Sequence, residues 1–520
     1  GSLTSIQDLR LSHNHFKIPI SLGPFFNLSK LKHLTGDNNE IYESTELVHN
    51  LIPRFQLQSL SLACTGFGGT FLKFLYYQHD LQFVDLSHIK MTGEFPSWLL
   101  QNNTKLEELY LVNNSLSGSF QLTNHSLVSW LSRLDISRNR IHNQIPTEIG
   151  ACFPRLVFLN LSRNDFSGSI PSSISNMSLL EVLDLSNNGL SGNIPEQLVE
   201  NCLSLGVLVL SNNYFKGQLF WKNFNLKYST KLILGGNQLT GILLNSLSNG
   251  SHLKALDVSL NNLSGKIPRW IGYMSSLQYL DLSENNLFGS LPSNFCSSRM
   301  MTEVYLSKNK LEGSLIGALD GCRSLNRLDL SHNSLTGEIP LELGYLSNIQ
   351  VLNLSHNNLT GPIPPTFSNL KEIESLDLSY NNLNGEIPYQ LVDLHYLAVF
   401  NVAYNNLSGK TPEMVGQFLT FNESSYEGNP LLCGPPLTNI CSGEPSPLSR
   451  YGFIDMQAFY VTFSGAYIIN LLTIGAVLYI NPHWRRAWFY FIRESINNCY
   501  YFLVDNLHAP ARFRRFQPCV

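Results

Sequence analysis

Several aspartates share one position of a repeated pattern, and their carboxylates could do chemistry. They take the fifth place of Leu-x-x-Leu-x-Leu-x-x-Asn, at Asp135, Asp184, Asp257, Asp281, Asp329 and Asp377. Stacked carboxylates could serve as general acids and bases or hold a cation. Each one, however, is followed by an aliphatic residue and Ser, so the aspartate belongs to the repeat template. We therefore predict no enzyme activity, no metal site and no cofactor.

Three arginines depart from that template on two adjacent copies of the pattern. Arg133 takes the third place, and Arg138 and Arg163 take the eighth. Clustered guanidinium groups suit a carboxylate or an acidic peptide through forked hydrogen bonds. The alternative is a solvated charge cluster that Glu107 and Glu108 partly neutralise. Both interpretations stay open.

Four aromatic side chains also take the eighth place, on consecutive copies near the end of the pattern. They are His332, His356, Tyr380 and Tyr404. Exposed aromatic residues favour protein interfaces, which makes this row a candidate contact. Simple stacking of the rings along the chain is the alternative.

The pattern that positions these residues recurs every 24 to 26 residues. Its ninth place falls at Asn14, Asn39, Thr65, Ile89, Asn114, Asn139, Asn164, Asn188, Asn213, Asn237, Asn261, Asn285, Asn309, Asn333, Asn357, Asn381 and Asn405. Repeats this short cannot bury their apolar faces alone, so we predict a right-handed α/β solenoid of about 17 coils. Each Leu-x-Leu should form a short inner strand, and each Asn amide should donate to and accept from backbone groups of the turn. Ile89 and the irregular segment 40–53 predict that the amino-terminal quarter is the least regular and least stable part.

A membrane span follows the repeats. The run 459–480 holds no Asp, Glu, Lys or Arg, and at about 1.5 Å per residue it is long enough to cross a bilayer. Arginines concentrated after it place the carboxyl terminus in the cytosol. The predicted boundaries are repeats 1–421, a cap 422–441, a linker 442–458, the span 459–480 and a cytosolic tail 481–520.

One face of the span carries small and polar residues every four positions. They are Ala458, Thr462, Ala466 and Asn470. Small residues allow close helix approach and an intramembrane Asn can hydrogen-bond across helices, so we expect this face to meet a partner helix.

Sequons and cysteines indicate a secreted portion followed by a cytosolic one. Twelve Asn-x-Ser/Thr sequons occur, at Asn27, Asn102, Asn113, Asn124, Asn160, Asn176, Asn249, Asn262, Asn353, Asn358, Asn406 and Asn422. Cys433 and Cys441 are close enough for a disulfide in the cap. Cys152, Cys202 and Cys322 are expected to be buried free thiols. The net charge of −4 argues against nucleic-acid binding.

Three strings resemble the plant leucine-rich-repeat receptor-like proteins, which lack a kinase and include the tomato Cladosporium-resistance receptors. They are Leu-Thr-Gly-Glu-Ile-Pro at 335–340, Glu-Gly-Asn-Pro-Leu-Leu-Cys-Gly-Pro-Pro-Leu at 427–437 and Asn-Pro-His-Trp-Arg-Arg-Ala-Trp-Phe at 481–489. The resemblance implies a single-pass type I plasma-membrane receptor that binds an extracellular peptide or microbial protein. It further implies signalling in defence through adaptor and co-receptor leucine-rich-repeat kinases, with the aromatic row as a co-receptor contact.

The chain departs from that family in two ways. Many members carry a non-repeat island before the last four repeats, but Asn309 and Asn333 are 24 residues apart and leave no room for one. Gly1 opens inside a repeat with no secretory signal, so we expect a fragment. Two alternatives remain: a soluble inhibitor of a pathogen enzyme, like the polygalacturonase-inhibiting proteins, and a non-signalling decoy.

Overall fold

The computed structural model describes residues 5–19, 22–42, 52–66, 68–70, 72–122, 129–218, 228–249, 252–293 and 295–441. They belong to one compact unit, Gly1–Cys441. The predicted linker, span and tail lie outside the described residues, and so does the face of Ala458, Thr462, Ala466 and Asn470. Within the described part, no helix combines the length and the apolar composition that a membrane crossing requires.

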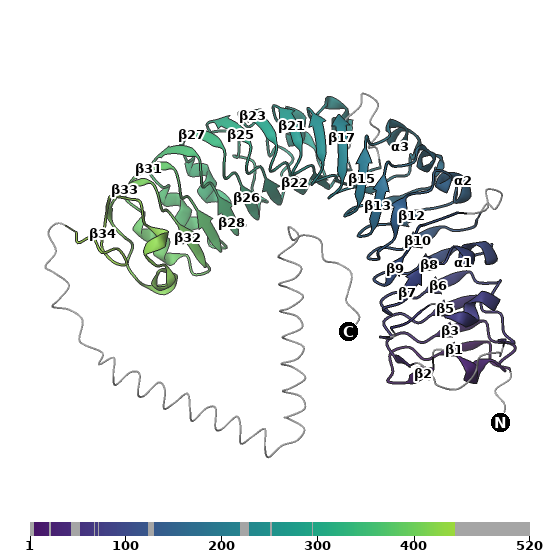
Figure 1. Cartoon of the computed structure of the whole chain (residues 1–520). Helices are drawn as coiled ribbons and strands as arrows, with labels where there is room; N and C mark the ends of the chain where they lie inside the picture. The colour runs from purple at the N-terminus through teal and green to yellow at the C-terminus, as the bar shows by residue number, and fades with distance from the viewer. Residues whose placement is uncertain are drawn as a thin grey trace, which may run out of the picture. The chain divides into compact units, whose positions relative to one another are not determined.

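A parallel sheet of 17 strands runs through the unit, with one strand for each predicted repeat. Figure 1 shows its strands along the inner side of the arc. Each strand pairs in register with the strand of the next coil, as Leu256 does with Leu280. The strands are β1 (Asp8–Arg10), β3 (His33–Thr35), β5 (Ser59–Ser61), β6 (Phe83–Asp85), β8 (Glu108–Tyr110), β10 (Arg133–Asp135), β12 (Phe158–Asn160), β14 (Val182–Asp184), β16 (Val207–Val209), β18 (Lys231–Ile233), β20 (Ala255–Asp257), β22 (Tyr279–Asp281), β24 (Glu303–Tyr305), β26 (Arg327–Asp329), β28 (Val351–Asn353), β30 (Ser375–Asp377) and β32 (Val399–Asn401).

The template leucines form the core, and the ninth-place asparagines tie the coils together. Leu280 and Leu282 are fully buried on either side of the outward-facing Asp281. Asn285 donates to the carbonyls of Val258, Leu282 and Ser283 at 2.9, 3.2 and 3.0 Å and accepts the N–H of Leu263 at 2.9 Å. The predicted use of both ends of the amide is therefore confirmed, and it satisfies peptide groups that no ladder pairs.

A second parallel sheet follows the asparagines, and the sequence interpretation missed it. It has 13 strands: β11 (His142–Gln144), β13 (Asp165–Gly168), β15 (Gly189–Gly192), β17 (Tyr214–Gln218), β19 (Gln238–Gly241), β21 (Asn262–Gly265), β23 (Asn286–Gly289), β25 (Lys310–Gly313), β27 (Ser334–Glu338), β29 (Asn358–Gly361), β31 (Asn382–Gly385), β33 (Asn406–Lys410) and β34 (Leu431–Cys433). The segment after the asparagine is thus hydrogen-bonded from coil to coil.

In the described residues, single-turn helices lie on the remaining side of most coils. Three are α-helical, namely α1 (Ser97–Asn102), α2 (Ile149–Cys152) and α3 (Glu196–Asn201). Ten are 3₁₀ turns: η1 (Gly23–Phe25), η2 (Lys73–Tyr77), η3 (Ser172–Asn176), η4 (Asn245–Asn249), η5 (Arg269–Tyr273), η6 (Leu341–Tyr345), η7 (Pro365–Asn369), η8 (Tyr389–Asp393), η9 (Gly416–Thr420) and η10 (Glu423–Ser425). A repeat of about 24 residues leaves room for only one tight turn, so the helical layer is mostly 3₁₀.

The amino-terminal quarter is less regular than the rest, as predicted. Its second-sheet strands form only two isolated pairs, β2 (Lys17–Pro19) with β4 (Glu40–Tyr42) and β7 (Thr92–Glu94) with β9 (Ser115–Ser117). A single bridge, Ser119 to His142, leads on to the longer sheet. The lower stability of this quarter stays a prediction.

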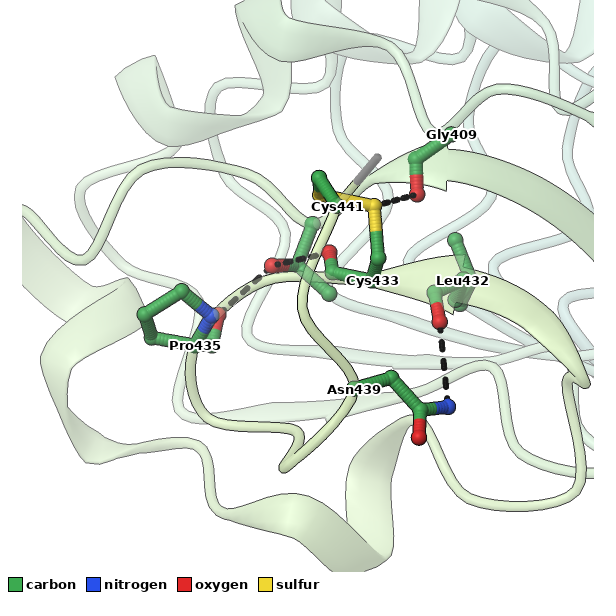
Figure 2. Close-up of a disulfide and its surroundings, with 7 residues drawn as sticks. Gly409, Leu432, Cys433, Pro435, Asn439 and Cys441 are labelled. Carbon is green, nitrogen blue, oxygen red and sulfur yellow. Dashed lines mark hydrogen bonds between the residues drawn. A yellow bond between two sulfur atoms is a disulfide. The ribbon is translucent and has the colours of Figure 1, made fainter. Parts of the chain in front are cut away.

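Disulfides close the carboxyl-terminal part of the unit. Cys433 and Cys441 are bonded in the cap, where Thr411 Oγ1 donates to the Pro435 carbonyl at 2.6 Å and Asn439 Nδ2 donates to the Leu432 carbonyl at 3.4 Å (Figure 2). The prediction of a free thiol at Cys322 is wrong, because Cys322 is bonded to Cys296 on the preceding coil. The two cysteines take different places in their repeats, so periodicity alone could not pair them. Cys152 and Cys202 are buried and free, as expected.

Candidate binding face

The aspartates of the inner sheet serve the backbone. Asp281 Oδ1 accepts the N–H of Ser283 at 3.0 Å and its Oγ at 2.6 Å, while Oδ2 accepts the Tyr279 hydroxyl at 3.2 Å. In five other coils the aspartate likewise accepts the backbone N–H of the serine two residues later: Asp135, Asp184, Asp257, Asp329 and Asp377. The template interpretation of these carboxylates accounts for their positions, and the described residues contain no cluster suited to a metal ion.

Burial nevertheless affects their titration. Burial raises the pKa of Asp257 to about 6, and the neighbouring Asp281 carboxylate adds to this rise. Burial likewise raises the pKa of Asp135 and of Asp184. Burial therefore disfavours the ionised form of these three carboxylates, and their hydrogen bonds offset this effect only in part.

Arg133 lies between an acidic and an aromatic neighbour. Its strand β10 pairs with β8 and β12, so that Glu108 and Phe158 flank it in register. The guanidinium carbon lies 5.8 Å from the centre of the Phe158 ring. On the other side Tyr110 donates its hydroxyl to Glu108 at 2.7 Å. Arg133 is exposed and is oriented by contacts that leave it facing solvent.

Arg138 and Arg163 stand next to each other at the eighth place of consecutive coils. Both are exposed and both have a positive φ, 56° and 53°. Arg163 lowers the pKa of Asp184, although burial of that carboxylate outweighs it. Burial lowers the pKa of His88, and the charge of Arg138 lowers it further. The structure therefore places the three predicted arginines on two adjacent coils, with Glu108 next to Arg133 and the Asp184 carboxylate near Arg163.

The eighth place has one backbone conformation throughout the solenoid. In all 17 coils its residue has a φ between 49° and 70°, from His13 to Tyr404. Neighbouring side chains in this row interact: Asn113 Nδ2 lies 3.0 Å from His88 Nδ1, Asn212 donates to Asn187 at 3.1 Å, and Lys308 pairs with Glu284 at 2.8 Å. Residues 24 or 25 apart in sequence are thus side by side along one edge of the inner face.

The four predicted aromatic residues are stacked in this row. The ring centres of His332 and His356 are 4.0 Å apart, those of His356 and Tyr380 4.2 Å, and those of Tyr380 and Tyr404 4.4 Å, with interplanar angles of 11°, 10° and 15°. Tyr380 and Tyr404 are each 44% exposed. We call these four residues the aromatic ladder.

A glycine ends the ladder. Gly428 takes the eighth place of the cap with a φ of 74°, and a Cβ there would lie 2.6 Å from Tyr404 Cδ1. Both faces of the Tyr404 ring are therefore covered, and Glu427 raises the pKa of its hydroxyl through charge and a hydrogen bond. Ring edges and hydroxyls are what the ladder presents to a partner.

The described sequons fall into distinct surroundings. Asn160 and Asn353 lie on the inner sheet, where each accepts the N–H and the hydroxyl of the sequon serine, and Asn160 also donates to Asp135 at 3.0 Å. Seven others are exposed: Asn27, Asn113, Asn176, Asn262, Asn358, Asn406 and Asn422. Asn102 is half-buried, and Asn124 lies outside the described residues. Glycosylation of all twelve stays a prediction.

Two residues of the inner face escaped the sequence interpretation. Val209 and Ile233 replace the aspartate or asparagine of the fifth place on consecutive coils. The row of ninth-place asparagines also continues to Asn429, which accepts the N–H of Leu407 at 3.0 Å. Both features can be read by applying the repeat spacing strictly, since 209 and 233 share the fifth place and 429 follows 405 by 24 residues.

Family models match the repeated part of the chain. A model described as "Leucine rich repeat" matches residues 230–287, 299–359 and 347–407, and a second of the same description matches 155–177 and 179–200.

Curated relatives are plant receptor-like proteins. The chain is 38% identical to Receptor-like protein 13 of Arabidopsis thaliana over 202 residues, which are 38% of this chain and 18% of the relative. It is 34% identical to Cuscuta receptor 1 of Solanum lycopersicum over 257 residues, which are 49% of this chain and 23% of the relative. The match thus spans about a fifth of the length of these relatives.

Solved structures with the same fold are plant receptor ectodomains. The peptide hormone receptor RGFR1 in complex with RGF2 has a TM-score of 0.69 and 28% identity, covering 83% of this chain and 79% of that one. The Arabidopsis receptor kinase HAESA in complex with the peptide hormone IDA and the co-receptor SERK1 has a TM-score of 0.53 and 28% identity, covering 84% and 83%.

Proposed function

Because this chain is a leucine-rich-repeat protein related to the plant receptor-like proteins, we propose that it is a cell-surface receptor without enzyme activity of its own. Its solenoid binds an extracellular peptide or microbial protein, and the signal passes to partner leucine-rich-repeat kinases in defence. The chain crosses the plasma membrane once at 459–480, with the solenoid outside and the tail 481–520 in the cytosol.

The arginine group of the inner face is the observation that carries ligand binding. Arg138 and Arg163 are like charges on adjacent coils, and Arg133 lies on the sheet beside them. A ligand carboxylate placed between neighbouring guanidinium groups would accept forked hydrogen bonds from them and reduce their mutual repulsion. The related RGFR1 and HAESA ectodomains are both bound to peptide hormones in their structures.

Charge reversal tests this site. Arg133→Glu with Arg138→Glu is expected to abolish the response of plant cells expressing the chain to peptide fractions of microbial culture filtrates. Arg140→Glu is the matched control, because Arg140 is exposed on the same coil but lies beyond Asn139, outside the inner strand. An undiminished response in the double variant would exclude the arginines as a ligand site.

The aromatic ladder supports a co-receptor contact. It lies on the last four inner-sheet coils before the cap, and interfaces favour exposed aromatic side chains. The HAESA structure includes the co-receptor SERK1 alongside its peptide. We expect Tyr380→Ala with Tyr404→Ala to weaken co-precipitation with co-receptor kinases, whereas Tyr389→Ala, a 75% exposed tyrosine of η8, leaves it unchanged. If the double variant co-precipitates as well as the parent, the aromatic ladder is not a co-receptor contact and its rings only stack on one another.

The membrane face of Ala458, Thr462, Ala466 and Asn470 is proposed to hold the adaptor kinase. Ala466→Ile should reduce association of the full chain with that kinase, because a bulky side chain prevents close helix approach. The alternative of a soluble inhibitor predicts release of the chain into the medium, so membrane fractionation of the same cells decides between them.

A further inference from the structure

The inner sheet is polar along most of its length, but its centre is apolar. On β16 the third and fifth places are Val207 and Val209, and β16 is the one strand of the described inner sheet with aliphatic residues at both. Val182 pairs with Val207, and Ile233 pairs with Val209 on the next strand. Val182, Val207 and Val209 are half-buried and Ile233 is buried. These four residues form what we call the apolar floor.

The apolar floor departs from the hydrogen-bonding pattern of the repeat. Elsewhere the fifth-place aspartate accepts the N–H of the residue two places on, as Asp184 does from Ser186 at 2.9 Å. A valine cannot accept that bond from Ser211, so Val209 gives up a hydrogen bond and exposes a methyl surface. Strand β16 still pairs in register with β14 and β18.

Cations border the floor on both sides. Lys231 pairs with Val207 on β18 and is exposed, and Arg163 stands two coils before β16. Asp184, next to Val209 in register, offsets part of the charge of Arg163. Along the same sheet Phe158 extends the apolar surface towards Arg133.

We infer that this stretch of the inner face binds an extended peptide segment whose apolar side chain rests on Val207 and Val209 and whose acidic group reaches Arg163. The inference rests on the proposed function and specifies the ligand. Strands lie about 4.8 Å apart, so β12 and β16 are about 10 Å apart, the length of about three extended residues. The recognised pattern is an acidic residue three positions from an aliphatic or aromatic one.

The floor is too small for a broad protein surface. It is three strands wide, about 10 Å between the outer two, which matches one or two side chains of a peptide. A second copy of this chain is the competing occupant, because an exposed apolar patch can pair with itself.

The probe is a phage-displayed library of random twelve-residue peptides, selected on the immobilised secreted repeat body with its cap, residues 1–441. We expect enrichment of peptides with an acidic residue three positions from an apolar one. Val209→Asp is expected to lower their binding at least about tenfold, since a charge replaces the surface on which one side chain is buried. Val399→Asp on β32 is the matched control and should not change binding, because Val399 is a solvent-exposed valine of the same sheet that lies far from the floor.

Val209→Asp restores the Asp-Leu-Ser template with Leu210 and Ser211, so we expect the variant to keep the fold of the parent. If it does not fold by circular dichroism, Val209→Thr keeps the volume and adds one hydroxyl, and it should lower binding by a smaller factor.

The outcomes separate the two proposals. Peptides that lose binding in the Arg133→Glu, Arg138→Glu variant but not in Val209→Asp would overturn this inference and leave the proposed function standing. Peptides that bind both variants as well as the parent would overturn both. Enrichment without the expected spacing, or no enrichment, contradicts the inference, and so does self-association of the body that Val209→Asp abolishes.

Discussion

The arginine pair and the aromatic ladder share a backbone but differ in how neighbouring side chains act on each other. Arg138 and Arg163 have φ of 56° and 53°, and the four ladder residues have φ between 52° and 54°. In the ladder each ring stacks on the next at 4.0 to 4.4 Å. In the arginine pair adjacent coils carry like charges, which repel one another.

The difference bears on how function is inferred from repeats. A stacked row contributes to its own stability, so its presence is explained with or without a partner. A like-charged pair is unfavourable in isolation and gains from an anion. The arginines therefore indicate a ligand more directly than the ladder indicates a co-receptor.

Removing a ninth-place amide should have the largest effect, and an equal one in both regions. Asn139 donates to three carbonyls at 2.9 to 3.2 Å and accepts the Leu116 N–H at 3.0 Å, and Asn381 makes the equivalent four bonds at 3.0 to 3.2 Å. Asn139→Ala and Asn381→Ala each leave buried backbone groups unpaired, so the free energy of local opening should fall by about 3–5 kcal/mol in native-state hydrogen exchange.

The exposed neighbour Asn382 is the control for this loss. Asn382→Ala should change local opening by less than about 0.5 kcal/mol, as is usual for exposed sites. If the Asn139 and Asn381 variants lose very different free energies of local opening, the backbones of the two regions are not equally stable. Their eighth-place side chains could then not be compared directly.

Substitutions at the eighth place should separate the regions. Tyr380→Ala removes two stacked contacts, so the surrounding coils should lose about 1–3 kcal/mol in the same measurement. Arg138→Asn keeps a residue that tolerates positive φ and removes repulsion from Arg163, so stability should stay unchanged or rise by about 0.5 kcal/mol. A loss in Arg138→Asn as large as that in Tyr380→Ala would mean that the arginines are structural.

The smallest expected effect is on histidine titration, measured by NMR. Burial lowers the pKa of both His88 and His356, and a neighbouring cation lowers each further: Arg138 for His88 and His332 for His356. Arg138→Asn should therefore raise the pKa of His88 alone, and His332→Asn that of His356 alone. Burial remains, so neither returns fully to 6.5.

The sign of the pH dependence follows. Because the folded pKa of each histidine is depressed, the unfolded chain binds more protons as the pH falls through about 6.5. Stability from these two sites is therefore present above that pH and is lost on acidification. A shift of His88 in the His332→Asn variant would point to a global rather than a local cause.

Most of the inner face could be predicted because the template repeats its chemistry. Leu-x-Leu spacing placed every inner strand, and the Asn amide bonds followed from what an amide can donate and accept. The same logic assigned the aspartates to the backbone, where Asp281 holds the N–H of Ser283.

Features that depend on contacts between coils were harder to predict. The second sheet pairs short segments such as Ser264 with Asn286, whose sequence reads as a turn. The Cys296–Cys322 bond joins different repeat places across a coil boundary. The side-by-side row at the eighth place was expected, but the positive φ that orients it is a property of the turn geometry.

The break in the second sheet has a mechanical consequence. From β11 onwards, two sheets are hydrogen-bonded from coil to coil. Between β9 and β11 only the inner sheet is continuous, and a single bridge represents the second sheet. The solenoid should bend most easily where only one of the two sheets is continuous. From β7 onwards, a sideways load on the solenoid should therefore concentrate its bending between Ser119 and His142, and His142 lies on the coil that carries Arg133.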